Sequence, residues 1–331
     1  MNVFVTGGTG LVGRHLIAAL RSRGDTVRAL ARTPDAAAAL SALGATTIAG
    51  EISDVAQIEQ GMASCDAVVH AAASVLASGP WRAWHRVNVL GTETVARCAA
   101  RLGLRVVHLS SVAVYGRSRA GLDRPGYDER FDLEGAPLPP EHYARSKREA
   151  ELVLWRVARE AGIRAVALRP CVIYGEGDRH FSPRIARLLR RGLVPVVGDG
   201  GNVMTLVYAG NVAAAVTAAL DHPEATGPFN VTNDGRLTLR EFVERFAAGL
   251  GARPRWVRIP RGLAWSAAGL WDATVGALLP LSRSLSLSAS VQFLAGDNRF
   301  QSARAEQLLG WRPPVVPAVA AERTGASFRT T

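Results

Sequence analysis

Residues 2–13 read Asn2-Val-Phe-Val-Thr-Gly-Gly-Thr-Gly-Leu-Val-Gly13, and this stretch decides the fold. The first five residues are an apolar, β-branched run that predicts a strand. Apolar residues then recur at helical spacing until Arg23-Gly24, which predicts a helix. Glycines at positions 7, 10 and 13 allow backbone N–H groups to approach a phosphate at the helix start. Strand, glycine loop and helix in this order predict a dinucleotide-binding unit, with a simple tight turn as the alternative.

The alternation of strands and helices continues along the chain. Strand-like runs occur at 26–31, 46–49, 67–70, 105–110 and 164–168, separated by helical stretches that include 81–101 and 142–161. Such near-continuous apolar strands predict an α/β fold with a doubly wound parallel (Rossmann) sheet. Loops rich in glycine and proline follow. We therefore predict a nucleotide-binding domain at 1–170 and a smaller substrate lobe at 171–331, with returning segments that complete the sheet.

Composition limits the class of partner. The net charge is +11, but basic residues are scattered and no aromatic residues are interleaved with them, so we expect no nucleic acid. Cys65, Cys98 and Cys171 show no metal-ligand spacing, which predicts buried thiols, no metal and a reducing compartment. The strand begins at Asn2 without a leader, so a cytoplasmic protein is expected. The apolar stretch 262–281 contains one charge, Asp272, which favours a buried or interfacial helix pair over a membrane span, with peripheral association as the alternative.

Tyr143 and Lys147 form a second candidate site. Lys147 is the only lysine among 39 basic residues, and it follows Tyr143 by four positions, which share one face of a helix. A compact ammonium suits contact with a phenol and a sugar hydroxyl better than a guanidinium does. A cation within about 4–6 Å lowers the pKa of a phenol from its usual value near ~10. The pair predicts proton transfer, and an ordinary amphipathic helix is the alternative.

A family resemblance rests on six segments, which are 6–13 (TGGTGLVG), 70–73 (HAAA), 88–91 (NVLG), 110–116 (SSVAVYG), 143–147 (YARSK) and 169–175 (RPCVIYG). In this order they resemble an extended short-chain dehydrogenase/reductase of the NAD-dependent epimerase/dehydratase superfamily, nearest to its 3β-hydroxysteroid dehydrogenase-like branch. The resemblance covers nearly the whole chain and implies a nicotinamide-dependent oxidoreductase.

The resemblance also implies which residues act. Ser111 would orient the substrate carbonyl or alcohol, Tyr143 would exchange its proton, and Lys147 would lower the pKa of Tyr143 and hold the nicotinamide ribose. A backbone role at the strand end is the alternative for Ser111. The expected cofactor contacts are Thr6, Gly7, Gly10, Leu11, Val12, Gly13, Arg28, Arg32, Glu51, Ile52, His70, Ala71, Ala72, Asn88, Tyr143, Lys147, Pro170 and Val172.

The cofactor is inferred from the end of the second predicted strand. Members of this family that use NAD usually carry an acidic residue there, which binds the ribose 2′-hydroxyl. This chain has Ala31-Arg32 instead, with Arg28 earlier in the strand. Because arginine accommodates a 2′-phosphate, NADP(H) is favoured and NAD(H) is the alternative.

The expected substrate contacts are Ser111, Tyr174 and Met204. Met204 stands where nucleotide-sugar enzymes of the family carry a diphosphate-binding arginine. An apolar residue there favours a hydrophobic ketone or secondary alcohol, such as a hydroxysteroid or a long-chain β-keto acid. The alternatives are a nucleotide-sugar epimerase or dehydratase that uses Arg179 or Arg184 instead, and a non-catalytic NADP-binding regulator. The two long helices suit a homodimer contact.

Overall fold

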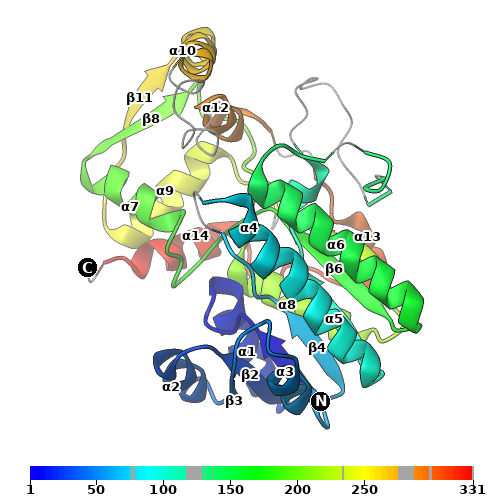
Figure 1. Ribbon diagram of the computed structural model, residues 1–331. Helices are drawn as coiled ribbons and strands as arrows, with labels where there is room; N and C mark the ends of the chain where they lie inside the picture. Colours follow the sequence, from blue (N-terminus) through cyan, green and yellow to red (C-terminus); the bar gives the residue numbers. More distant parts are fainter. Residues whose placement is uncertain are drawn as a thin grey trace.

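A seven-stranded parallel sheet forms the centre of the molecule (Figure 1). The computed structural model describes residues 1–75, 79–116, 129–130, 132–136, 138–232, 235–274, 287–297 and 300–329. The strand order is β10-β6-β5-β4-β1-β2-β3, and all neighbours are parallel. The order reverses beside β1, as in doubly wound sheets that bind dinucleotides at that point. The predicted fold class is confirmed.

The strands of this sheet are β1 (Asn2–Thr6), β2 (Thr26–Ala31), β3 (Thr46–Ala49), β4 (Ala67–His70), β5 (Arg105–Leu109), β6 (Ala165–Pro170) and β10 (Gly227–Val231). One face is covered by α1 (Leu11–Ser22), α2 (Pro34–Ala42), α8 (Ala209–Asp221) and α13 (Ala303–Leu309). The other is covered by α3 (Val55–Met62), α5 (Gly91–Arg101) and α6 (His142–Ala161). Successive side chains of a strand point to opposite faces, so Val3 and Val5 pack on the α1 side and Phe4 on the α3 side.

The predicted helix 81–101 contains an irregular segment. It consists of α4 (Trp81–Trp84), the π-helical segment η1 (His85–Leu90) and then α5. The α5 helix lies beside α6 on the same face of the sheet (Figure 1). The π-helix is rare and is found frequently at functional sites. Apolar periodicity does not reveal it, because a segment of six residues changes the helical phase only slightly.

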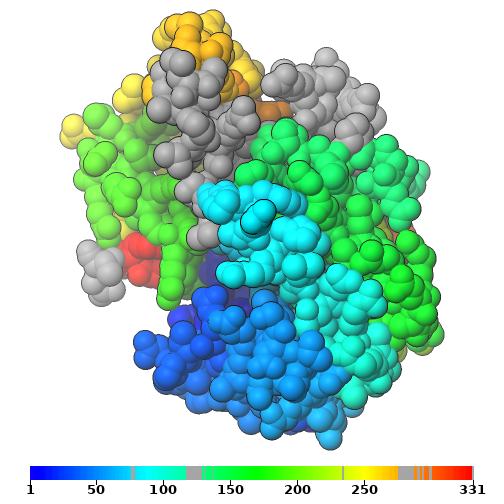
Figure 2. All heavy atoms as spheres, viewed as in Figure 1, coloured from blue at the N-terminus to red at the C-terminus, as the bar shows by residue number. Residues whose placement is uncertain are grey.

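The later part of the chain adds a second, smaller hydrophobic core. The elements of this part are β7 (Val172–Tyr174) paired with β9 (Leu206–Tyr208), β8 (Leu193–Val197) paired with β11 (Arg255–Ile259), and the helices α7 (Ser182–Arg190), α9 (Leu239–Leu250), α10 (Arg261–Ala273), α12 (Leu287–Ala295) and α14 (Pro317–Ala326). Phe242 and Phe246 of α9 are fully buried in this core. In Figure 2 the green to orange residues of this part occupy the upper left of the view, and the blue N-terminal residues the bottom.

The α10 helix is apolar and largely exposed. It is buried only at Ala264 and Ala268, while Leu263 and Leu270 are 62% and 67% exposed. Asp272 accepts two backbone N–H groups at the start of α12, at 2.9 and 3.2 Å, which explains a charge in this apolar stretch. Within the described ranges, no helix is both long enough and apolar enough to cross a membrane. Residues 275–286 of the predicted helix pair lie outside the described residues.

Candidate active site

The glycine loop brings backbone atoms closer together than side chains would permit. Gly7 has φ +75°, and a Cβ placed on it would lie 2.5 Å from backbone atoms of Ala71 and Ala72. A Cβ on Gly13 would lie 2.3 Å from the Gly7 carbonyl oxygen. The glycine loop therefore lies directly against the residues that follow β4, and the first turn of α1 packs directly on the glycine loop. Glycines at these positions leave room for a dinucleotide phosphate to approach the protein backbone closely.

The start of α1 also fits an anion. Gly10 occupies the N-cap without a side chain to bond the first N–H groups, and the first turn contains no acidic residue. Exposed N–H groups at a helix start attract a phosphate through their partial positive charge. Thr9 and Gly10 are exposed and Leu11 is partly exposed. Gly10, Leu11, Val12 and Gly13 are therefore the residues that would hold the pyrophosphate of a dinucleotide.

Arg28, within β2, and Arg32, directly after β2, lie at opposite ends of the sheet. Arg32 is exposed at the carboxyl end of β2 and makes no hydrogen bond or ion pair with any described residue. Arg28 donates from Nη1 to the Ala63 carbonyl at 2.7 Å, before the start of β4 and thus at the opposite edge of the sheet. The predicted contribution of Arg28 to cofactor binding is therefore not supported. Beyond β3, Glu51 is exposed and Ile52 packs near Gly91.

The other predicted cofactor contacts gather around the glycine loop and the carboxyl ends of the strands. Ala71 and Ala72 are half-buried beside Gly7, and His70 is buried at the end of β4. Asn88 is buried in η1. Pro170 is buried at the end of β6, whereas Val172 of β7 is exposed. The structure thus brings most of the predicted set to one edge of the sheet.

Tyr143, Ser111 and Lys147 form one cluster. The Ser111 hydroxyl lies close enough to the Tyr143 hydroxyl to lower the pKa of that phenol. Lys147 lies one helical turn further along α6, and its Nζ donates to the Leu109 carbonyl at the end of β5, at 2.8 Å. The ring of Trp84 meets the Tyr143 ring edge-on, with 6.0 Å between centroids. The expected i, i+4 arrangement on one helix face is present.

Burial changes the proton affinities of this cluster. Burial raises the pKa of the Tyr143 phenol, and the nearby Ser111 hydroxyl partly offsets this increase. Burial lowers the pKa of Lys147 to about 8, against a smaller raising effect of the Glu151 carboxylate. The prediction that Lys147 lowers the pKa of Tyr143 is wrong in this structure. Desolvation dominates at the phenol.

Neighbouring serines have different partners. Ser110 is buried and donates to Glu151 Oε2 at 2.6 Å, whereas Ser111 caps the short 3₁₀ helix η2 (Val112–Tyr115) and lies beside the Tyr143 hydroxyl. The backbone role that was the alternative for Ser111 therefore exists, and it coexists with the contact to the phenol. The geometry favours Ser111 over Ser110 as the hydroxyl that faces substrate.

A buried ion pair joins α6, the helix of Tyr143 and Lys147, to β6. The Arg169 and Glu151 side chains are 2% and 0% exposed and form a bidentate pair. Arg169 Nη1 also donates to the Tyr115 hydroxyl at 2.9 Å, and Tyr115 donates to Asn230 Oδ1 at 2.7 Å. This network joins α6, β6, η2 and β10. Our sequence analysis missed it, although Glu151 follows Lys147 by four residues, the same spacing that identified Lys147 itself.

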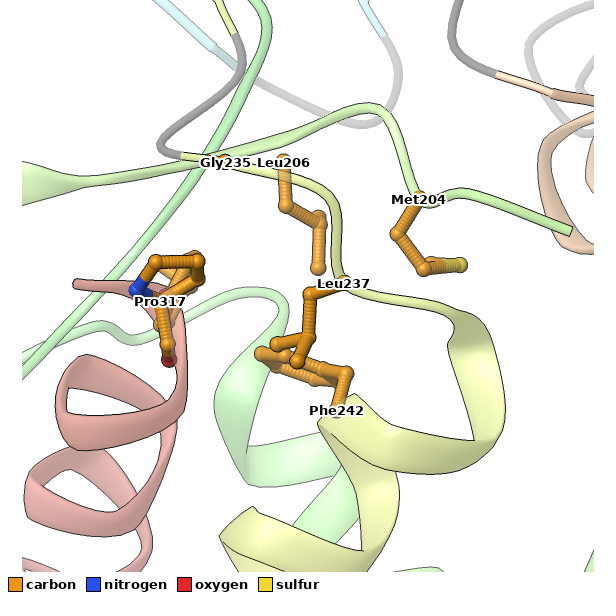
Figure 3. Close-up of a pocket in the computed structure, with 7 residues that line it drawn as sticks. Met204, Leu206, Gly235, Leu237, Phe242 and Pro317 are labelled. Atoms are coloured by element: carbon orange, nitrogen blue, oxygen red, sulfur yellow. The ribbon is translucent and has the colours of Figure 1, made fainter. Parts of the chain in front are cut away.

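The two further predicted substrate residues lie in the second core. Tyr174 is 1% and Met204 is 4% exposed, and both line a recess with Leu206, Gly235, Leu237, Phe242 and Pro317 (Figure 3). The recess has a volume of about 10 Å³, close to the space of one water molecule. Tyr174 donates to the Pro317 carbonyl at 3.4 Å. Their contact with a substrate stays a prediction.

The thiols of Cys65, Cys98 and Cys171 are buried and are not joined in disulfides, as expected. In the part of the chain that the structure describes, no group of His, Cys, Asp and Glu side chains is arranged to hold a metal ion.

The fold and the site together define an extended short-chain dehydrogenase/reductase. A sequence model of the NAD dependent epimerase/dehydratase family matches residues 3–233. The chain belongs to this family. The family is nicotinamide-dependent, in agreement with a glycine loop and helix start that fit a dinucleotide.

Relatives with known activities cover most of the chain. A 4-hydroxy-2-methyl-3-oxo-4-farnesyl-3,4-dihydroquinoline-1-oxide ketoreductase of Stigmatella aurantiaca is 33% identical over 94% of this chain and 92% of its own. A 2-alkyl-3-oxoalkanoate reductase of Stenotrophomonas maltophilia is 32% identical over 89% and 88%. A 3beta-hydroxysteroid-dehydrogenase/decarboxylase of Arabidopsis thaliana is 26% identical over 98% and 79%. The resemblance to the hydroxysteroid dehydrogenase-like branch is confirmed.

Solved structures show the same fold. The UDP-N-acetylglucosamine 4-epimerase of Bacillus cereus superposes with a TM-score of 0.73 over 99% of both chains, at 20% sequence identity.

Proposed function

We propose that this protein transfers hydride between a nicotinamide dinucleotide and a hydrophobic ketone or secondary alcohol. The observation that carries the proposal is the placement of the Ser111 hydroxyl beside the Tyr143 phenol, one helical turn from the buried ammonium of Lys147. A phenol beside a second hydroxyl can exchange a proton with an oxygen bound between them.

Each residue of the cluster has a distinct role in this proposal. Ser111 orients the substrate oxygen, and Tyr143 gives a proton to that oxygen in reduction or takes it in oxidation. Lys147, whose Nζ is held at the Leu109 carbonyl, contributes a donor for a ribose hydroxyl. A nicotinamide dinucleotide, when bound, supplies or accepts the hydride. The raised pKa of Tyr143 keeps the phenol protonated at neutral pH, which suits reduction of a ketone.

The proposed substrate class rests on Met204 and on the relatives. Met204 stands at the position where nucleotide-sugar enzymes of the family carry a diphosphate-binding arginine. Met204 and the residues around it form an apolar lining in the second core. Two of the relatives above 30% identity act on a farnesylated quinoline and on 2-alkyl-3-oxoalkanoates, which are both oxo compounds with apolar chains. We propose that the substrate binds between the catalytic cluster of domain 1–170 and the lobe 171–331.

NADP(H) is the proposed cofactor. Support comes from the exposed Arg32 at the end of β2, which no described residue engages and which is therefore available to a 2′-phosphate. NAD(H) is the alternative. We further propose a cytoplasmic homodimer with contacts through α5 and α6. Size-exclusion chromatography with light scattering at micromolar concentrations would test this assembly.

A nucleotide-sugar epimerase is the second candidate function. It is supported by the fold shared with the Bacillus cereus epimerase and by Arg179 and Arg184, which are exposed before and within α7. The non-catalytic regulator is a weaker reading, because Tyr143 and Lys147 are both kept and are in contact with their neighbours.

The test is a screen of hydrophobic ketones, secondary alcohols and UDP-sugars with both cofactors, monitored by nicotinamide absorbance and by sugar analysis. We expect ketone-dependent oxidation of NADPH. Tyr143→Phe should reduce kcat by at least about 10²-fold and leave cofactor affinity nearly unchanged, because only the proton-transfer hydroxyl is lost. Epimerisation of a UDP-sugar without ketone reduction would favour the second candidate. A Tyr143→Phe variant with activity within a few-fold of the original would exclude Tyr143 from the mechanism.

A further inference from the structure

A chain of hydrogen bonds runs behind the site from the glycine loop to the catalytic tyrosine. Thr6, the last residue of β1, contacts His70 Nδ1 through Oγ1 at 2.7 Å. His70 Nε2 contacts Thr92 Oγ1 on α5 at 3.0 Å, and Thr92 donates to the Asn88 carbonyl at 2.6 Å. The next links lie in η1 and α6. Asn88 Nδ2 donates to Ser146 Oγ at 2.9 Å, and Ser146 donates to the Tyr143 carbonyl at 2.9 Å.

The direction of these bonds fixes the protonation of His70. Thr92 has one hydroxyl proton, and it is used on the Asn88 carbonyl, which can only accept. Nε2 of His70 must therefore be the donor to Thr92. Nδ1 then carries the lone pair and accepts from the Thr6 hydroxyl. Thr6 Oγ1 in turn accepts from the Ala72 N–H at 3.4 Å.

Each internal link is buried. Thr6, His70, Asn88, Thr92 and Ser146 are all at most 2% exposed. Burial strengthens hydrogen bonds by excluding competing water, and it makes an unpaired group costly. The chain is therefore a well-defined connection between β1, β4, α5, η1 and α6. Neutral His70 fits it, because burial lowers the pKa of this imidazole to about 3.

The first turn of α6 has no side-chain cap among the described residues. Glu141 occupies the N-cap position of this helix. Uncapped helix starts fray unless tertiary contacts hold them. Tyr143 lies in that first turn. The bond from Ser146 to the Tyr143 carbonyl, together with the bond from Asn88 to Ser146, connects this first turn to η1.

We propose that this chain positions Tyr143 relative to the glycine loop, and that Thr92, at its centre, is a positioning residue for the proton transfer. Thr92 contacts neither the glycine loop nor Tyr143 and acts only through its neighbours. Among the described residues, its hydroxyl is the group whose hydrogen bonds link His70 to η1. The proposal deepens the proposed function, and its kinetic test rests on that function.

Thr92→Val tests the link, because valine retains the shape and lacks the hydroxyl. Thr92→Ser is the conservative rescue, since it keeps the hydroxyl. Thr94→Val is the matched control. Thr94 lies on the same helix and donates to the Leu90 carbonyl at 3.0 Å, the same i−4 bond, but it is outside the chain. We expect Thr92→Val to lower kcat about tenfold with cofactor Kd within about twofold of the original. The rescue and control variants should show nearly full activity.

A second measurement needs no substrate. NMR of protein labelled with ¹³C at tyrosine Cζ, assigned with Tyr143→Phe, reports the titration of Tyr143. In Thr92→Val the midpoint should rise, because a displaced phenol loses the lowering effect of Ser111. Ser146→Ala removes the hydroxyl that ends the series of hydrogen bonds and should also raise the titration midpoint of Tyr143. This variant provides the test if Thr92→Val fails to fold. ¹⁵N spectra should show the Nε2–H tautomer of His70 between about pH 5 and 8.

The outcomes are distinct. If no ketone is reduced by the original protein, the proposed function fails, and the tyrosine titration still tests the chain. If both Thr92→Val and Ser146→Ala leave the titration of Tyr143 unchanged, the positioning role is wrong. An equal loss of kcat in Thr94→Val, or an Nδ1–H tautomer of His70, would also overturn it.

Discussion

Loss of the Glu151 charge should destabilise the protein strongly. The Glu151→Gln substitution retains the size of the side chain but leaves the Arg169 guanidinium, which is 2% exposed, without its counter-ion. Lys147 and Arg148 are buried on the same helix, and the Glu151 carboxylate favours the charged form of both, so its loss would also affect these two cations. Removing one member of a buried pair typically costs about 3–5 kcal/mol. We expect a fall of that size in the free energy of unfolding, measured by urea denaturation at pH 7.

The control is Glu93→Gln on α5. Glu93 accepts from Arg97 and Arg156 at 2.9–3.0 Å, but the partners are about half exposed, so the expected cost is below about 1 kcal/mol. In the double variant Glu151→Gln with Arg169→Gln, both charges are gone. The fall in its free energy of unfolding should be clearly smaller than the sum of the falls in the two single variants. A Glu151→Gln cost as small as that of Glu93→Gln, or additive losses, would show that the buried pair is not coupled as described.

Three further predictions concern charge and the cofactor. Lys147→Arg should reduce kcat and weaken cofactor binding, because a guanidinium cannot fit the place of the ammonium at the Leu109 carbonyl; normal kinetics would contradict the role of the lone lysine. Replacing Ala31 by Asp and Arg32 by Asn should reverse the cofactor preference by about one to two decades in Kd for NADPH and NADH, and equal affinities in the original protein would contradict the NADP proposal. The free energy of unfolding should decrease as the pH is lowered below about 6.5. Burial lowers the pKa of His70 to about 3 in the folded protein, so the unfolded chain binds the proton first. The expected loss for His70 at pH 5 is about 2 kcal/mol relative to pH 7 in urea denaturation, and a flat profile between these values would refute it.

Most strands of the sheet and the two local motifs could be predicted from sequence alone. The glycine spacing at 7, 10 and 13 predicted the loop and the helix start, because sterics between adjacent residues restrict the backbone there. Periodicity located every strand of the parallel sheet except β10, which is the last to join it. The i, i+4 spacing placed Tyr143 and Lys147 on one face of α6, because helix geometry is local.

Only the tertiary structure decided which groups meet and how strongly burial acts on them. Arg28 and Arg32 are four residues apart, but packing directs Arg28 to Ala63 and leaves Arg32 exposed at the ligand edge. The sign of the pKa shift at Tyr143 also depends on tertiary structure, because desolvation is set by every element that packs around the phenol. The link from Asn88 to Ser146 joins residues 58 positions apart. No local pattern encodes such a contact, since it exists only when η1 and α6 lie side by side.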